Sequence, residues 1–159
     1  MRRVRAADSV AAAGGVALLA SLFADWYSTP PLRVPGVGFA PLDVGVNAWQ
    51  AFSVLDVVLA LLALAPLALV VLQATRDSPA LPIAFSVLTT VAGALALLLI
   101  LYRIVNQPGP NEAVEVEAGA WAGLVAAAVM TAGGWRSMRD ESMPGVALPP
   151  VEDLPAPAP

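Results

Sequence analysis

Asp56 and Arg103, two charged residues of long apolar segments, are the strongest candidates for chemistry in this sequence. Asp56 lies within the apolar segment 49–73, and Arg103 ends the apolar segment 81–103. If these segments cross a membrane, an unpaired carboxylate at the depth of Asp56 costs roughly 2.5 to 3.5 kcal/mol. Asp56 is therefore expected to be paired, protonated or hydrated, and such a carboxylate can carry a proton or bind an ion.

The predicted partner of Asp56 is Arg103. In a continuous helix Asp56 lies about 10 Å inward from Trp49, near the same membrane surface as Arg103. Asp25, at the end of the segment 9–27, competes for the same guanidinium. We therefore predict a cluster of Asp25, Asp56 and Arg103 that joins three helices. Three interpretations are open: the cluster fixes helix register, it carries protons or ions, or Arg103 extends to water and leaves Asp56 alone.

The composition removes most other catalytic chemistry. The chain contains no Cys, no His and no Lys, so thiol nucleophiles, Ser-His hydrolases and the common zinc sites cannot be built. It also lacks a P-loop, a GxGxxG motif and the GxGD motif of intramembrane aspartyl proteases. A net charge of −4 is unsuited to nucleic acids, which require a clustered basic surface. We predict no enzyme activity, no catalytic residue, no cofactor, no metal site and no nucleic-acid partner.

Four apolar segments are the elements that would position these residues. Hydrophobic residues make up 58% of the chain and charged residues 13%, against about 25% charged residues in soluble domains. The apolar residues are mainly Ala, Leu and Val, which favours lipid-embedded helices over a β-barrel. A span needs roughly 20 apolar residues, and the segments of about 9–27, 49–73, 81–103 and 118–135 qualify. We predict an all-α, four-transmembrane-helix bundle with up-down topology.

The distribution of arginine predicts the orientation of this bundle. Positive charge is enriched in cytoplasmic loops, and one side of the predicted bundle holds most of the arginines. That side carries Arg2, Arg3, Arg5, Arg76, Arg136 and Arg139, whereas Arg33 and Arg103 lie on the other. Both termini are therefore predicted to be cytoplasmic, in a plasma membrane. The first segment resembles a signal peptide, but Leu22 stands where signal peptidase prefers a small residue, so an uncleaved anchor is expected.

The segments outside the predicted spans are rich in Pro and Gly. The outer loops, at about 28–48 and 106–117, are predicted to be irregular or only briefly structured. Residues 1–141 form one predicted membrane domain, and the Pro- and Ala-rich tail 142–159 is predicted to be a disordered cytoplasmic extension. The aromatic residues gather near the boundaries like an aromatic belt, with Trp26, Tyr27, Trp49, Tyr102 and Trp121 outside and Trp135 inside.

Small and polar residues recur every three or four positions and indicate the helix faces that should meet other helices. The second segment has such a stripe from Trp49 through Asp56 to Ala63, and the third has one from Ser86 to Arg103. A GxxxG pair opens the fourth segment, and Ala11 with Gly15 forms a weaker pair in the first. The predicted helix-packing residues are Ser53, Ala60, Gly93, Gly119 and Gly123.

Three stretches carry a resemblance to other proteins. They are Asn47–Leu59 (NAWQAFSVLDVVL), Gly119–Leu124 (GAWAGL) and Ala132–Glu141 (AGGWRSMRDE). Over roughly residues 8–141 the chain resembles a group of small uncharacterised four-span membrane proteins from actinobacteria. This resemblance implies the topology and carries over no activity. The layout is also similar to that of claudin-like four-span proteins, although the paired cysteines of their outer loop have no counterpart here.

These observations predict a non-enzymatic integral membrane protein. Small-residue helix faces and the lack of reactive groups favour an accessory or scaffold subunit of a membrane complex, or a self-associating protein. Its expected partners are the lipid bilayer and either further copies of the chain or another membrane protein. The alternative is a small oligomeric transporter or channel with a polar path past Asp56.

Overall fold

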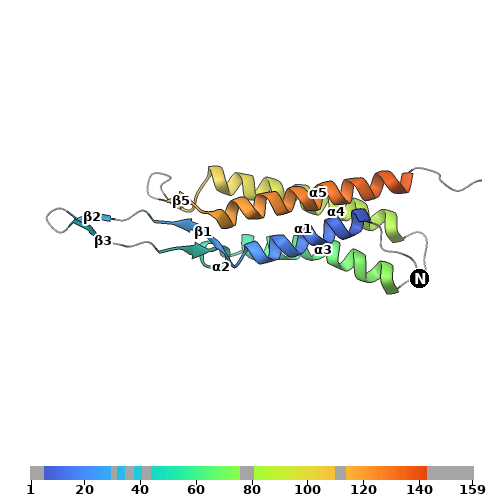
Figure 1. Cartoon of the computed structure of the whole chain (residues 1–159), viewed down its shortest axis with the longest axis horizontal. Helices are drawn as coiled ribbons and strands as arrows, with labels where there is room; N and C mark the ends of the chain where they lie inside the picture. Colours follow the sequence, from blue (N-terminus) through green and yellow to red (C-terminus); the bar gives the residue numbers. More distant parts are fainter. Residues whose placement is uncertain are drawn as a thin grey trace, which may run out of the picture.

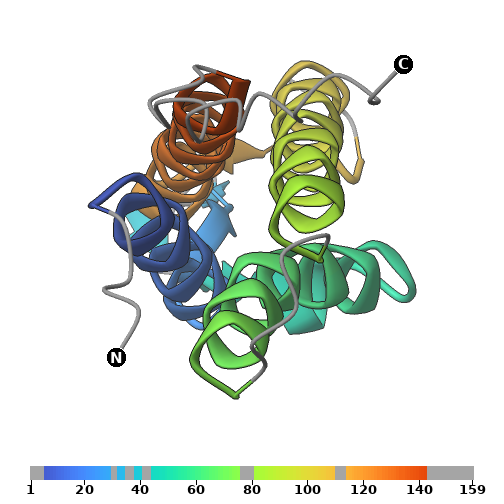
Figure 2. The same cartoon turned by 90° about the vertical axis from the view of Figure 1, so that its right-hand side faces the viewer.

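The computed structural model describes residues 6–29, 32–34, 38–40, 44–75, 81–109 and 114–142, and this part of the chain is mostly helical. Four long helices lie side by side along the longest axis (Figure 1). Viewed from one end, α1 and α4 lie on opposite sides, and each packs against both α3 and α5 (Figure 2). We call these helices the helical body: α1 (Ala6–Ser21), α3 (Leu55–Thr75), α4 (Leu81–Val105) and α5 (Ala118–Ser142).

Two of the described helices are long and apolar enough to cross a membrane. They are the segments Phe85–Val105 of α4 and Ala118–Asp140 of α5. The segments Ala6–Ser21 of α1 and Leu55–Ala68 of α3 are also apolar but shorter. Residues 143–159 of the predicted tail 142–159 and the arginines at positions 2, 3, 5 and 76 lie outside the described residues, whereas Ser142 is the last residue of α5.

A small antiparallel sheet lies at one end of the helical body, which we call the sheet end (Figure 1). Its central strand β1 (Asp25–Ser28) pairs with β4 (Val46–Asn47) on one side and β5 (Glu115–Val116) on the other. A second pair, β2 (Leu32–Val34) and β3 (Gly38–Ala40), forms a hairpin that projects beyond the sheet. Strand β1, most of which was predicted to belong to the first helix, therefore links the two predicted outer loops.

The first apolar segment ends as a helix earlier than predicted. Helix α1 stops at Ser21, and the chain then turns and enters β1, so Asp25, Trp26 and Tyr27 are not helical. The cause is the alternative set of hydrogen bonds available to this stretch. Backbone N–H groups of residues 22–24 bond back to the last turn of α1, and the Trp26 indole N–H donates to the Ser21 carbonyl over 2.7 Å.

The second apolar segment is interrupted where a continuous helix was predicted. A single turn, α2 (Ala48–Ala51), precedes α3, and Phe52 between them has extended backbone. Asn47 and Gln50 form a reciprocal capping box that starts α2. The break turns the Phe52 side chain inward, where it is buried beside the aromatic residues of β1.

The opposite end of the helical body, which we call the far end, contains the start of α1, the end of α3, the start of α4 and the end of α5 (Figure 1). Adjacent glycines of α5 allow two helices to approach here. A Cβ on Gly133 would lie 2.5 Å from the Ala11 nitrogen of α1, and one on Gly134 would lie 2.7 Å from the Thr90 hydroxyl of α4. Helix α5 therefore packs closely against both neighbours only because these positions lack side chains.

Candidate functional site

Asp56, the first predicted site residue, lies near the sheet end in the first turn of α3 and is buried. Its Oδ1 atom accepts a hydrogen bond from the Val57 backbone N–H over 2.8 Å. The first N–H groups of a helix have no intrahelical partner, so a carboxylate in this turn satisfies one of them and interacts favourably with the helix dipole.

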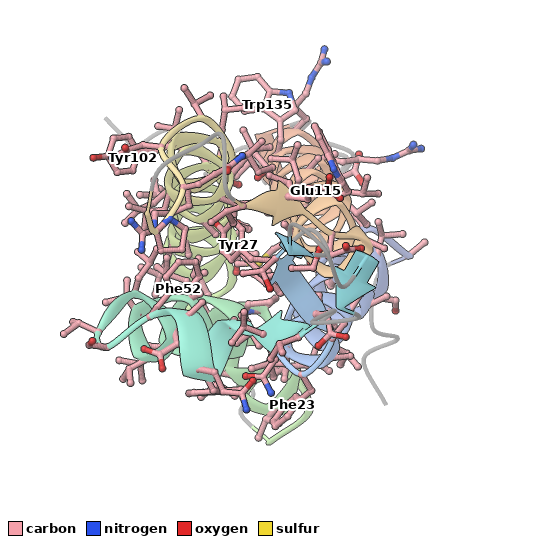
Figure 3. The ribbon with its side chains drawn as sticks, turned by 90° about the vertical axis from the view of Figure 1, so that its left-hand side faces the viewer. Phe23, Tyr27, Phe52, Tyr102, Glu115 and Trp135 are labelled. Carbon is pink, nitrogen blue, oxygen red and sulfur yellow. The ribbon has the colours of Figure 1, made fainter. Side chains whose placement is uncertain are left out.

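The side chain of Arg103, the predicted partner of Asp56, lies over an aromatic ring. Its guanidinium carbon lies 4.4 Å from the centroid of the Phe52 ring, within the range of a cation–π interaction. The Arg103 backbone carbonyl accepts a hydrogen bond from the Tyr27 hydroxyl over 3.0 Å. Tyr27 and Phe52 both point toward the middle of the sheet end, while Tyr102 points outward from α4 (Figure 3).

Asp25, the third predicted member, begins β1 and is exposed. A Cβ added to Gly45 would lie 2.6 Å from the carboxyl carbon of Asp25, so the Asp25 side chain packs against the residue that precedes β4. Within the described part of the chain, no ion pair joins Arg103 to Asp25 or Asp56. The three residues thus lie at the same end of the molecule, with contacts that differ from the predicted pairing.

The predicted helix-packing residues have three different environments. Ser53 is exposed in the break between α2 and α3, because this break removes it from the stripe on which the sequence placed it. Gly93 is buried against Thr131 of α5, and Ala60 is half-buried in α3. Gly119 and Gly123 are buried, but they face Trp26 at the sheet end, and Gly119 also contacts the Asp25 backbone.

Aromatic packing beneath the sheet was not predicted. Trp26 and Tyr27 were assigned to an aromatic belt, yet both are almost fully buried. Phe52 meets each of them edge to face, with ring centroids 5.6 Å and 5.9 Å apart. Burial raises the pKa of the Tyr27 hydroxyl, although the nearby charge of Arg103 partly offsets this effect. The Ser28 hydroxyl at this end donates a hydrogen bond to the Glu117 carboxylate over 2.6 Å.

A second polar group lies at the far end and was missed in the sequence. The Ser137 hydroxyl of α5 donates to Oδ1 of Asp8 in α1 over 2.6 Å, and both side chains are 0% exposed. Ser86 and Thr89 of α4 are buried to the same extent. The Oδ2 atom of Asp8 and the Oγ1 atom of Thr89 are buried without a hydrogen-bond partner. We call Asp8, Ser86, Thr89 and Ser137 the far-end polar group.

The sequence did contain a signal for this group. Asp8 precedes Ala11 by three positions and Ser137 follows Gly133 by four, which places each on the small-residue stripe of its own helix. The predicted first span began at about residue 9, so it excluded the carboxylate. The pairing across 129 positions depends on the α1–α5 contact, and helix periodicity alone does not determine that contact.

Aliphatic side chains separate the two polar ends. Leu18, Leu59, Ile100 and Met130 are 0% exposed and come from all four long helices. They belong to one continuous apolar core with Leu22, Ala63, Ala96 and Ala127. The described structure therefore places the far-end polar group and Asp56 on opposite sides of a packed apolar layer.

The surface between α1 and α5 carries a shallow apolar groove of about 560 Å³. Most of the side chains that line it are small, with a tryptophan among them. They are Ala13, Gly14 and Ala17 of α1 and Trp121, Ala122, Val125, Ala126 and Val129 of α5.

No known protein family, curated protein or solved structure matches this chain. Among the described residues, no three His, Cys, Asp or Glu side chains gather to hold a metal ion. In the part of the chain that the structure describes, the candidate groups are a buried carboxylate at each end (Asp8 and Asp56), Arg103 on the Phe52 ring, and the apolar groove.

Proposed function

We propose that the protein is a non-enzymatic, four-span integral membrane protein that acts as an accessory or scaffold subunit. In this proposal the sheet end lies outside a plasma membrane, and the far end, with both termini, lies on the cytoplasmic side. The arginine distribution of the sequence supports this orientation. The two long apolar helices α4 and α5 support the membrane location.

The observation that carries the scaffold role is the groove between α1 and α5. Helices associate in membranes mainly through close packing of small residues, because lipid tails are as apolar as leucine. The groove offers Ala13, Gly14 and Ala17 on one wall and Ala122 on the other. Its small-residue lining is suited to close packing by one transmembrane helix of a partner polypeptide.

Transport through a single copy of the chain is less well supported by the same contacts. A polar path past Asp56 would have to continue toward the far end within one chain. It would meet Leu18, Leu59 and Met130, which are fully buried between the helices. Transport through a single copy would require these side chains to separate, whereas a scaffold requires no internal path.

The test is purification of the tagged full chain from its native membrane in polymer nanodiscs. We expect a second polypeptide in fixed stoichiometry, identified by mass spectrometry and by the particle mass. Ala17→Leu and Ala122→Leu place large side chains into the groove, and both positions are exposed, so the fold should be retained. Each substitution should reduce the recovery of the partner by at least about tenfold, equivalent to about 1.4 kcal/mol of binding free energy.

Ala128→Leu is the matched control, since Ala128 is exposed on α5 and does not line the groove. It should leave the partner bound. A particle that contains only copies of this chain and separates on filling the groove would identify self-association. Ion flux across liposomes that is lost in Asp56→Asn would contradict the scaffold role and favour a transporter or channel.

A further inference from the structure

The far-end polar group contains a buried acceptor that the described residues leave unused. Oδ1 of Asp8 receives the Ser137 hydroxyl, but Oδ2 of Asp8 has no partner although the residue is fully buried. Buried polar atoms without partners are uncommon in folded proteins, and a bound water or ion is one of their explanations. A carboxylate oxygen is the more costly case, because it carries charge.

Helix α4 brings a second unused oxygen to the same end of the interior. Thr89 is fully buried, and its Oγ1 atom has no partner. Its position follows from the packing on α5, since a Cβ on Gly134 would lie 3.2 Å from Cγ2 of Thr89. Ser137 follows Gly134 by about one helical turn on α5. Thr89 therefore packs on α5 about one helical turn from Ser137, which bonds to Asp8 on the neighbouring face of α5 that meets α1.

The contact that the structure gives the Asp8 carboxylate at this end is with the neutral Ser137 hydroxyl. Asp8 brings one carboxylate into the interior, while Arg136 and Arg139 of α5 are exposed. A small ligand that satisfies Oδ2 must donate a hydrogen bond or carry positive charge. One positive charge is sufficient to neutralise a single carboxylate, whereas calcium sites normally use six to eight oxygen ligands, often several of them carboxylates.

We propose that Asp8, Thr89 and Ser137 form a binding site for a hydrated monovalent cation of the size of sodium. The carboxylate supplies the charge, the two hydroxyls supply neutral oxygens, and water completes the coordination. The apolar layer of Leu18, Leu59 and Met130 closes the site toward the sheet end. The cation enters and leaves from the far end only, so the site holds α1, α4 and α5 together and does not form part of a path.

The experiment measures the binding of sodium itself to the purified full chain in detergent. Radioactive sodium should bind with a stoichiometry of one per chain. Sodium chloride should raise the melting temperature above that in N-methylglucamine chloride at equal ionic strength. The increase should grow with the logarithm of sodium concentration, because a ligand that binds only the folded state stabilises it by mass action.

Asp8→Asn should abolish both sodium binding and the sodium-dependent increase in melting temperature, and Thr89→Val should weaken binding at least tenfold. Asp25→Asn removes an exposed carboxylate and is the control that should behave as the unmodified chain. If Asp8→Asn does not fold, Thr89→Val and Ser137→Ala decide the question by direct binding. Absence of sodium binding to the unmodified chain, or its persistence in Thr89→Val and Ser137→Ala, would overturn the proposal and leave a water site. The result is independent of whether a partner polypeptide is found.

Discussion

The sheet end and the far end stabilise buried polar groups in different ways. At the sheet end most polar groups bond to backbone close in space: Trp26 donates to Ser21, Tyr27 to the Arg103 carbonyl, and Asp56 accepts from Val57. At the far end one hydrogen bond between two side chains joins the first and last helices. The carboxylate there keeps an unused oxygen.

This difference indicates that the sheet end has mainly a structural role. Backbone partners satisfy several polar groups at the sheet end, although Nε of Arg103 is buried there without a hydrogen-bond partner, and aromatic side chains fill the space between the strands and the helices. The far end has no sheet among its described residues, so its polar side chains must satisfy one another across helices. The far end combines an unused carboxylate oxygen of Asp8 with an unused hydroxyl oxygen of Thr89, and we therefore locate the proposed cation site there.

The largest expected effect comes from the aromatic packing at the sheet end. Trp26→Ala removes a fully buried side chain together with its hydrogen bond to Ser21. Such truncations cost about 3 to 5 kcal/mol of unfolding free energy. Denaturant unfolding in detergent should show this loss. Trp135→Ala is the control, because Trp135 is 55% exposed, and its effect on unfolding should stay within about 0.5 kcal/mol.

A smaller effect is expected from the single hydrogen bond at the far end. In a double-mutant cycle of Asp8→Ala and Ser137→Ala, the coupling energy should be about 1 to 3 kcal/mol, because each single change leaves a buried partner unpaired. The cycle is measured in N-methylglucamine chloride, so that sodium binding does not contribute. Purely additive effects would show that the two helices are held here by packing alone.

Arg103 has two candidate partners, the Phe52 ring that it contacts and the Asp56 carboxylate that the sequence predicted. Because the guanidinium lies on the Phe52 ring, a cycle of Arg103→Gln and Phe52→Leu should give about 0.5 to 2 kcal/mol of coupling in unfolding free energy. The corresponding cycle with Asp56→Asn should give little, since Asp56 contacts the Val57 amide. Larger coupling to Asp56 than to Phe52 would favour the ion pair that the sequence predicted.

Helix periodicity predicted the helical regions well and the two ends poorly. The helical segments in α4 and α5 follow from their long apolar runs, and the predicted limits agree within a few residues except where α5 continues to Ser142. Strand β1 pairs with residues about 20 and 90 positions away, and such contacts leave no period in the sequence. These contacts lie beside the end of α1 and the break at Phe52, where local hydrogen bonds and the capping box of α2 also act. Nearby residues alone therefore could not predict the surroundings of Asp25, Asp56 and Arg103.

The smallest expected effect is a pH dependence that belongs to the sheet end alone. Burial raises the pKa of Tyr27 above its ordinary value of 10.0. As pH rises through 10, the unfolded chain loses this phenolic proton while the folded chain keeps it, so stability decreases until the folded pKa is reached. The stability supplied by the neutral phenol is therefore complete below pH 10 and is lost above it.

Tyr27→Phe should lower the unfolding free energy by about 0.5 to 1.5 kcal/mol at neutral pH through loss of the hydrogen bond to Arg103. The same change should reduce the decrease at alkaline pH, as followed by unfolding curves and tyrosinate absorbance. An equal alkaline decrease in the unmodified chain and Tyr27→Phe would place its origin away from β1.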